Sequence, residues 1–158
     1  MNLSIFIHPY HTLYQISTVF NFDDIPFGYK TLEHFEKDLI HLMIHSQGMG
    51  LAANQLGITK RFFAIGHESF DVFQKPAIIY NPVLVSADKE NELAQEGCLS
   101  FPEMLLQVER PKTVMVRYQN AERNYLMCRL EGMEARCFQH ELDHVDGITF
   151  NQRTKKEK

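Results

Sequence analysis

Two segments of the chain carry apolar residues at the spacing of an amphipathic helix. The first covers residues 31–47, where Thr31 can cap the beginning and Gly48 can end the helix. Its apolar positions are Leu32, Phe35, Leu39, Ile40, Leu42, Met43 and Ile44. The second covers residues 132–146, and Gly147 is expected to end it. Four of its side chains fall on one helical stripe, namely Met133, Cys137, His140 and His144.

Four short segments between these helices are typical of β-strands. They are rich in Ile, Val, Phe and Tyr and are separated by Gly, Pro, Asn and charged residues. Their ranges are residues 61–65, 77–85, 113–119 and 124–130. The order helix, strands, helix predicts an α+β fold, in which a mostly antiparallel sheet packs around the C-terminal helix.

Length and charge limit the organisation of the chain and its partners. A chain of 158 residues is expected to form a single domain, which we place at residues 1–150 with a short basic tail at 151–158. Sixteen Lys and Arg against twenty Asp and Glu give a net charge of −4, which argues against binding to nucleic acid or to an anionic membrane. We also expect a monomer.

The cysteine count and the apolar runs predict a soluble, cytoplasmic protein. Three cysteines cannot all pair within one chain, which indicates a reducing compartment and leaves Cys98, Cys128 and Cys137 free for packing or chemistry. No apolar run approaches the roughly 18 residues that a membrane span needs. Residues 1–29 lack the basic residues of a secretion signal, so none is expected.

The second predicted helix contains an H-E-x-x-H pattern, formed by His140, Glu141 and His144. On a helix this spacing places two imidazoles one turn apart on one face, with a carboxylate beside them. A chance motif on a polar helix face is the alternative. Because the histidines share their stripe with Met133 and Cys137, they are expected to face the core, where a metal ion would satisfy them.

A catalytic ion needs a third protein ligand. The pattern that places a third His after the motif fails here because Phe150 occupies that position, and only fourteen residues follow His144. The third ligand must therefore lie upstream. Cys98, beside Gly97, is the preferred candidate because a thiolate suits a borderline-soft ion such as zinc. Cys128 and Cys137 are interpreted as packing residues.

Two other segments carry patterns that could indicate a binding site. His41 and His45 also have helical spacing, with His34 nearby, but they lie opposite the apolar stripe and are interpreted as a solvated polar face. Residues 48–55 formally fit a dinucleotide-binding pattern, but a helix precedes the segment and a strand follows it, which is the reverse of the required context. The glycines there indicate an unusual turn or a backbone surface for substrate, and Gln55 could stabilise an oxyanion.

Three segments together resemble the signature motifs of the peptide deformylases. They read G-M-G-L-A-A-N-Q at residues 48–55, E-G-C-L-S at 96–100 and Q-H-E-L-D-H at 139–144. The resemblance implies removal of the formyl group from the N-terminal formyl-methionine of nascent polypeptides, with formate as the other product. It also implies one divalent ion, natively Fe(II), with Zn, Ni or Co able to replace it.

The resemblance implies a role for each matching residue. Cys98, His140 and His144 would be the metal ligands, and Glu141 the general acid and base that moves a proton from water to the departing amine. Gln55 and the backbone N–H of Leu99 would hold the oxyanion. For the substrate, the candidates are the backbone at Gly50 and a methionine pocket formed by Met49, Met133 and Cys137, whose alternative role is ordinary core packing.

Further matches and departures refine the expectations. Glu96 and Arg110 match positions that pair with one another in the family, whereas two unrelated surface charges are the alternative. Leu105 stands where many relatives have an Arg that helps to hold the peptide, which affects peptide preference.

The shortened C-terminus lacks the helix that some relatives use to dock on the ribosome, so docking by that route is not expected. A small peptidase and a metal-stabilised binding module are the competing interpretations.

Overall fold

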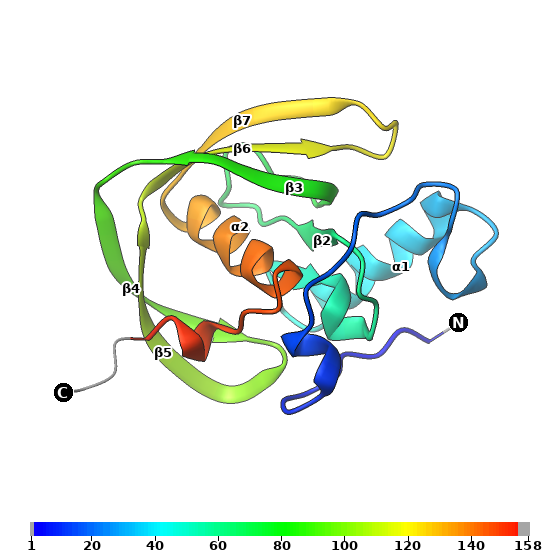
Figure 1. Ribbon diagram of the computed structural model, residues 1–158, viewed down its shortest axis with the longest axis horizontal. Helices are drawn as coiled ribbons and strands as arrows, with labels where there is room; N and C mark the ends of the chain where they lie inside the picture. Colours follow the sequence, from blue (N-terminus) through cyan, green and yellow to red (C-terminus); the bar gives the residue numbers. More distant parts are fainter. Residues whose placement is uncertain (1, 155–158) are drawn as a thin grey trace.

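Helix α2, Gly132–Val145, lies at the centre of the molecule with strands above, beside and below it (Figure 1). The structure is a computed structural model that describes residues 2–154. Every residue from 134 to 145 is buried, which explains why this helix carries both an apolar stripe and a set of buried polar side chains. The basic tail expected at residues 151–158 lies outside the described residues from position 155 onward.

The main sheet has five strands in the order β1-β2-β3-β6-β7, and all of its neighbouring pairs are antiparallel. The strands are β1 (Gly50–Ala52), β2 (Phe62–Ile65), β3 (Ala77–Ala87), β6 (Thr113–Gln119) and β7 (Tyr125–Glu131). A separate antiparallel hairpin consists of β4 (Asn91–Cys98) and β5 (Phe101–Pro111). This is the expected α+β class with mostly antiparallel strands.

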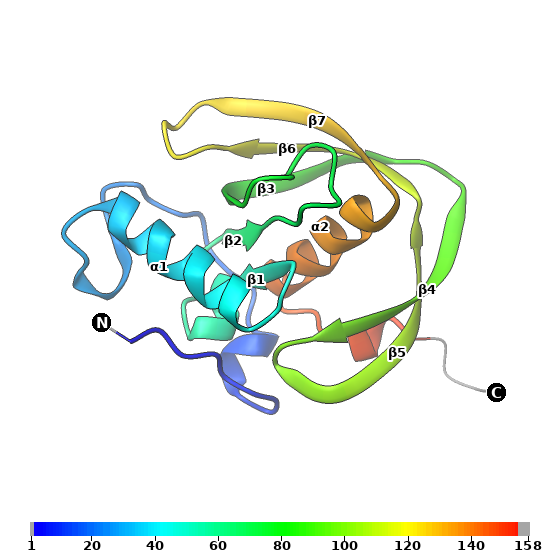
Figure 2. The same ribbon diagram turned by 180° about the vertical axis from the view of Figure 1, so that it is seen from behind.

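Helices cover the two faces of the sheet. Helix α1 (Leu32–His45) packs on one face and α2 on the other (Figure 2). Successive strand residues point to opposite faces, so Phe62 of β2 joins the α1 side of the core and Phe63 the α2 side. Residues 2–154 also contain four short 3₁₀ segments, at His11–Tyr14, Pro26–Gly28, Ala53–Leu56 (η3) and Phe150–Gln152.

Both predicted helices are confirmed, with small differences at their ends. Thr31 caps α1, since its side chain accepts a hydrogen bond from the backbone N–H of His34. The helix ends at His45, and Gln47 rather than Gly48 has the positive φ that follows it. Gly147 follows α2 with a φ of 73°, as expected for a helix end. No helix within residues 2–154 is long and apolar enough to cross a membrane.

All four predicted strands are present, but three others were missed. Strand β1 lies in the glycine segment that was interpreted as a turn or a backbone surface. The β4–β5 hairpin was missed because its side chains are largely exposed and many are polar, so it lacks an apolar alternation. This hairpin carries Cys98 at the end of β4, and it therefore forms one wall of the site.

Candidate metal centre and substrate pocket

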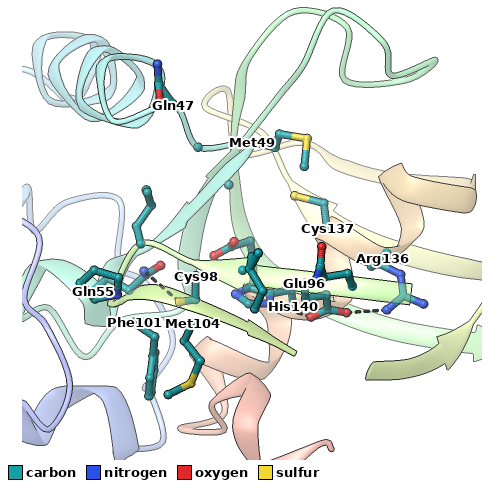
Figure 3. A pocket seen from close by; sticks show the side chains of 18 of the residues that line it. Gln47, Met49, Gln55, Glu96, Cys98, Phe101, Met104, Arg136, Cys137 and His140 are labelled. Carbon is teal, nitrogen blue, oxygen red and sulfur yellow. Dashed lines mark hydrogen bonds and ion pairs between the residues drawn. The ribbon is translucent and has the colours of Figure 1, made fainter. Parts of the chain in front are cut away.

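Cys98, His140 and His144 come together as the sequence predicted. Each offers one ligand atom, and these atoms all lie within 4.8 Å of one another. Cys98 Sγ is 3.3 Å from Nε2 of His144, and both histidines are buried on α2. The cysteine comes from the hairpin and the histidines from the helix, so the cluster joins the two elements (Figure 3).

The carboxylate of Glu96 fixes the orientation of His140. Nδ1 of His140 lies 2.9 Å from Oε1 of Glu96. Burial tends to raise the pKa of Glu96, but hydrogen bonds from His140 and Arg110 outweigh it and lower the pKa to about 2. Because Glu96 is then an ionised acceptor, Nδ1 of His140 donates to it, and Nε2 is left as the ring nitrogen that can serve as a ligand.

Glu96 is the centre of a buried network of ion pairs. Arg110 binds it through two hydrogen bonds of 2.6 and 2.9 Å, which confirms the pair that the family resemblance implied. A second guanidinium, that of Arg136, lies 2.6 Å from the same carboxylate. Arg110 also donates to Asp143 at 2.9 Å, and Asp143 accepts from Arg153 at 2.8 and 3.0 Å. Asp143 therefore supports the helix and does not join the cluster.

The donor set fits a divalent metal ion. One thiol sulfur and two imidazole nitrogens converge, which is the ligand chemistry of Zn²⁺ and other late first-row ions. Burial lowers the pKa of His144 well below its usual range, which keeps this imidazole neutral. For His140, burial is outweighed by hydrogen bonds with Cys98 and Glu96, which raise its pKa to about 10, so metal binding displaces a proton from the cluster.

Glu141 follows His140 on the helix and lines the pocket. The residue is buried, and Oε2 has no hydrogen-bond partner within residues 2–154. Burial raises the pKa of Glu141 to about 7, although the nearby His140 opposes this shift. A buried carboxylate whose pKa lies close to neutrality can both accept and return a proton, which is what a general acid and base requires.

The two glycines of the 48–55 segment allow strand β1 to approach the site closely. A Cβ atom on Gly50 would lie 2.5 Å from Oε1 of Glu141, and one on Gly48 would lie 2.8 Å from the side chain of Leu99. Neither glycine has a positive φ. The unusual turn is therefore wrong for these two glycines, whose backbone instead approaches Glu141 and Leu99 closely, and the backbone surface for substrate stays a prediction.

Gln55 faces the same cluster from η3. Its side chain is 1% exposed, and Nε2 lies 3.7 Å from Sγ of Cys98. The other end of the amide, Oε1, accepts a hydrogen bond of 2.9 Å from the backbone N–H of Ala52. Leu99 directly follows Cys98, is half-buried and lines the same pocket as Gln55. The amide N–H₂ group of Gln55 is thus directed toward the site, as an oxyanion donor must be.

A pocket of about 480 Å³ opens beside the cluster. All four predicted substrate residues line it, namely Met49, Gly50, Met133 and Cys137. Figure 3 shows Met49 and Cys137 among the lining side chains. Met133 is 48% exposed, so ordinary core packing does not explain it. Burial raises the pKa of Cys137 well above its usual range, so its thiol stays neutral and forms an apolar wall. Leu105 also lines the pocket and is 62% exposed, at the rim.

Two residues that shape the site, Arg136 and Ser100, were not predicted from the sequence. Arg136 lines the pocket and binds Glu96, and its position four residues before His140 on the helix was an available signal. Ser100 is fully buried and bonds to Gln55 at 3.0 Å. It belongs to the E-G-C-L-S segment, but sequence alone could not identify its partner. His34, His41 and His45 are exposed on α1, as predicted for a solvated face.

An α+β domain that places a Cys, two His and an unpaired Glu beside an apolar pocket is a metal-dependent hydrolase. The family model described as Polypeptide deformylase matches residues 3–158. The chain belongs to this family, whose members remove the N-formyl group from nascent peptides.

Individual relatives and solved structures agree with the family assignment. The peptide deformylase of Thermotoga petrophila is 44% identical over 135 residues, which are 85% of this chain and 76% of that protein. The crystal structure of peptide deformylase from Thermotoga maritima has a TM-score of 0.85 and 37% identity, and covers 98% of both chains. The crystal structure of a peptide deformylase from Synechococcus elongatus in complex with actinonin has a TM-score of 0.87 and 32% identity. This match covers 98% of the present chain and 82% of the Synechococcus chain.

Proposed function

We propose that this chain hydrolyses the formyl group of N-terminal formyl-methionine on nascent polypeptides and releases formate. The observation that carries the proposal is that Glu141, a buried carboxylate whose Oε2 has no hydrogen-bond partner within residues 2–154, lines the same pocket as Cys98 and His140 of the cluster. We assign Cys98, His140 and His144 as ligands of one divalent ion, which when bound polarises a carbonyl and lowers the pKa of water toward about 7.

The side chains around the cluster provide the remaining chemistry. Glu141 accepts a proton from the attacking water and later returns it to the departing amine, for which its pKa of about 7 is suitable. The Nε2 group of Gln55 and the backbone N–H of Leu99 hold the oxygen that becomes negative as the formyl carbon is attacked. Each of these groups acts from a buried or half-buried position, where water competes little.

The methionine side chain is assigned to the apolar part of the pocket. The side chains of Met49 and Cys137 lie close to one another in the pocket (Figure 3). Met133 also lines the pocket and is 48% exposed. The strand backbone at Gly50 offers a surface along which an extended peptide can lie. We further propose Fe(II) as the native ion, a monomer and a cytoplasmic location, where nascent polypeptides are available. We do not propose nucleic acid or a membrane as a partner, nor docking on the ribosome through a C-terminal helix.

A formate assay on anaerobically prepared protein tests the function. The protein loaded with Fe(II) or Ni(II) is expected to release formate from formyl-Met-Ala-Ser, and to leave the unformylated peptide intact. Metal analysis of anaerobically purified protein is expected to find one iron per chain. Cleavage of internal peptide bonds without formate release would support the small peptidase instead, and a loaded protein without either activity would support the binding module.

Replacement of Gly50 by alanine is expected to lower kcat strongly. The added Cβ would lie 2.5 Å from Oε1 of Glu141, a distance that forces the strand or the carboxylate to move. A displacement of about 1 Å in a catalytic group can cost roughly 10²-fold in rate. Gly28→Ala is the matched control for folding, since its added Cβ meets nothing within 4 Å although its φ of 70° makes it strained. An unchanged kcat in Gly50→Ala would contradict the close approach.

Replacement of Leu105 by arginine is expected to lower KM for formyl tripeptides. The side chain lines the pocket rim and is 62% exposed, so a longer guanidinium can enter solvent and donate hydrogen bonds to peptide carbonyls. The kcat value should stay within about twofold because Leu105 has no role in the assigned proton transfer or oxyanion binding. Steady-state kinetics with formyl-Met-Ala-Ser measure both values. Leu105→Lys serves as the control for charge alone, because it lacks the planar fork.

A further inference from the structure

Ser100 occupies a buried position between Gln55 and the N-terminal segment. It is 0% exposed, and its Oγ atom has two partners at hydrogen-bond distance. One is Nε2 of Gln55 at 3.0 Å, and the other is the backbone carbonyl oxygen of Phe6 at 2.8 Å. Three segments that are distant in sequence therefore meet at this one hydroxyl group.

The donors and acceptors in this chain of contacts can be assigned without ambiguity. A carbonyl oxygen can only accept, so the single proton of the Ser100 hydroxyl is donated to Phe6. The hydroxyl oxygen must then act as the acceptor toward Gln55. At the other end of the amide, the backbone N–H of Ala52 can only donate, so it must face Oε1 of Gln55.

These contacts fix which way the amide of Gln55 points. Oε1 is bound by Ala52 and one N–H of Nε2 is bound by Ser100, so the second N–H is the group that faces Cys98 and the pocket. The reversed amide would place two acceptors, Oε1 and Ser100 Oγ, against one another. It would also place two N–H donors together at Ala52.

The N-terminal segment holds this arrangement in place. The backbone N–H of Phe6 donates to the backbone carbonyl of Gln55 at 2.7 Å, and that of His8 donates to the carbonyl of Ser100 at 2.9 Å. The segment, dark blue in Figure 1, thus passes beside η3 and binds both residues. The ring of Phe6 stacks on Tyr10 with centroids 3.9 Å apart, which limits its motion.

We propose that Ser100 is a positioning residue for Gln55, and that the carbonyl of Phe6 sets the direction of its hydroxyl group. The proposal rests on the role assigned to Gln55 under the proposed function. Ser100 does not touch the substrate. It acts by selecting the amide orientation that presents an N–H to the oxyanion, so its effect belongs to the transition state and appears in kcat more than in KM.

A double-mutant cycle in the metal-loaded full chain tests the proposal. Ser100→Ala is expected to lower kcat for formyl-Met-Ala-Ser about tenfold and to change KM less than twofold, a smaller loss than the roughly 10²–10³-fold expected for Gln55→Ala. In the Gln55→Ala background, Ser100→Ala should cause no further loss, because the group that it positions is gone. Equal losses in both backgrounds, or an unchanged kcat in the single variant, would overturn the proposal.

Ser17→Ala is the matched control. Ser17 is 4% exposed, and its Oγ has no hydrogen-bond partner within residues 2–154. The Ser17→Ala substitution removes the same hydroxyl group from a buried position. The kcat of this variant is expected to equal that of the wild type. If Ser100→Ala is not recovered in folded form, Ser100→Cys carries the same test, since a thiol is a weak donor and acceptor.

The side-chain amide of Gln55 provides a measurement that does not depend on activity. Its two N–H resonances, assigned by their absence in Gln55→Ala, are expected to be separate and to exchange slowly in the wild type. In Ser100→Ala they should exchange faster and move closer together. Unchanged resonances would overturn the positioning role even in an active enzyme. A wild-type protein that releases no formate but shows the expected resonances would refute the proposed function alone.

Discussion

The Glu141→Gln enzyme is expected to lose about 10²–10⁴-fold in kcat while it retains one metal ion per chain. Removal of a general acid and base typically costs this much. Glutamine has nearly the same shape, so it keeps the close contact with Gly50 but cannot carry the proton between water and the departing amine. The assigned ligands, Cys98, His140 and His144, are untouched, so metal content should not change.

Formate release and metal content are measured on the same preparation of this variant. Glu131→Gln is the matched control, because Glu131 precedes the same helix but is exposed and pairs with the exposed Arg129. It should retain wild-type kcat. Wild-type turnover in Glu141→Gln would contradict the acid and base role. Loss of metal in parallel with activity would contradict it as well, since Glu141 would then act as a ligand.

The Glu96→Gln substitution is expected to destabilise the protein by about 3–5 kcal/mol, the cost of breaking a buried ion pair from one side. Glu96 accepts from Arg110, Arg136 and His140, all of which are buried. When Glu96 loses its charge, the guanidinium groups of Arg110 and Arg136 stay buried but lose one counter-ion. The substitution should also weaken metal binding about 10–100-fold, because His140 loses the acceptor that orients it.

Urea unfolding with the same saturating metal concentration measures this change, and a competition titration measures the metal affinity. Glu90→Gln is the control, since Glu90 also pairs with a basic residue, Lys112, but the pair is exposed at 3.3 Å. Its unfolding midpoint should equal that of the wild type. A loss below about 1 kcal/mol for Glu96→Gln would show that the network contributes little to stability, contrary to its burial.

The helix that carries the histidines could be predicted because its chemistry and its periodicity coincide. His140 and His144 share the 3.6-residue stripe with apolar positions, and the same spacing forms the H-E-x-x-H motif. Cys98 could be predicted as the third ligand because no suitable ligand follows His144. Three of the predicted strands, β2, β3 and β6, were visible because they bury Ile, Val, Phe or Tyr side chains in the core. Strand β7 was visible from its apolar composition alone, since Leu130 is its one buried residue.

The hairpin could not be predicted because polar contacts hold it in place. Arg136 of α2 donates to the carbonyl of Glu92 at 2.6 Å and to that of Val108 at 2.8 Å, one on each strand of the hairpin. Backbone carbonyls leave no trace in a sequence, so neither the strands nor the partner of Arg136 could be inferred. The orientation of Gln55 was hidden for the same reason, since it depends on the backbone of Ala52 and Phe6.

The assigned ligands lie on two elements that differ in burial, since His140 and His144 are on the buried helix α2 and Cys98 is on the largely exposed β4–β5 hairpin. Amide hydrogen exchange is expected to differ between these two elements. The backbone amides of α2 are enclosed over residues 134–145 and should exchange only when the whole protein unfolds. Those of β4 and β5 lie under largely exposed side chains and should exchange through local opening. Opening of the hairpin separates Cys98 from His140 and His144 without melting the helix. Protection of the hairpin amides will therefore report on metal occupancy, whereas protection of α2 reports on global stability.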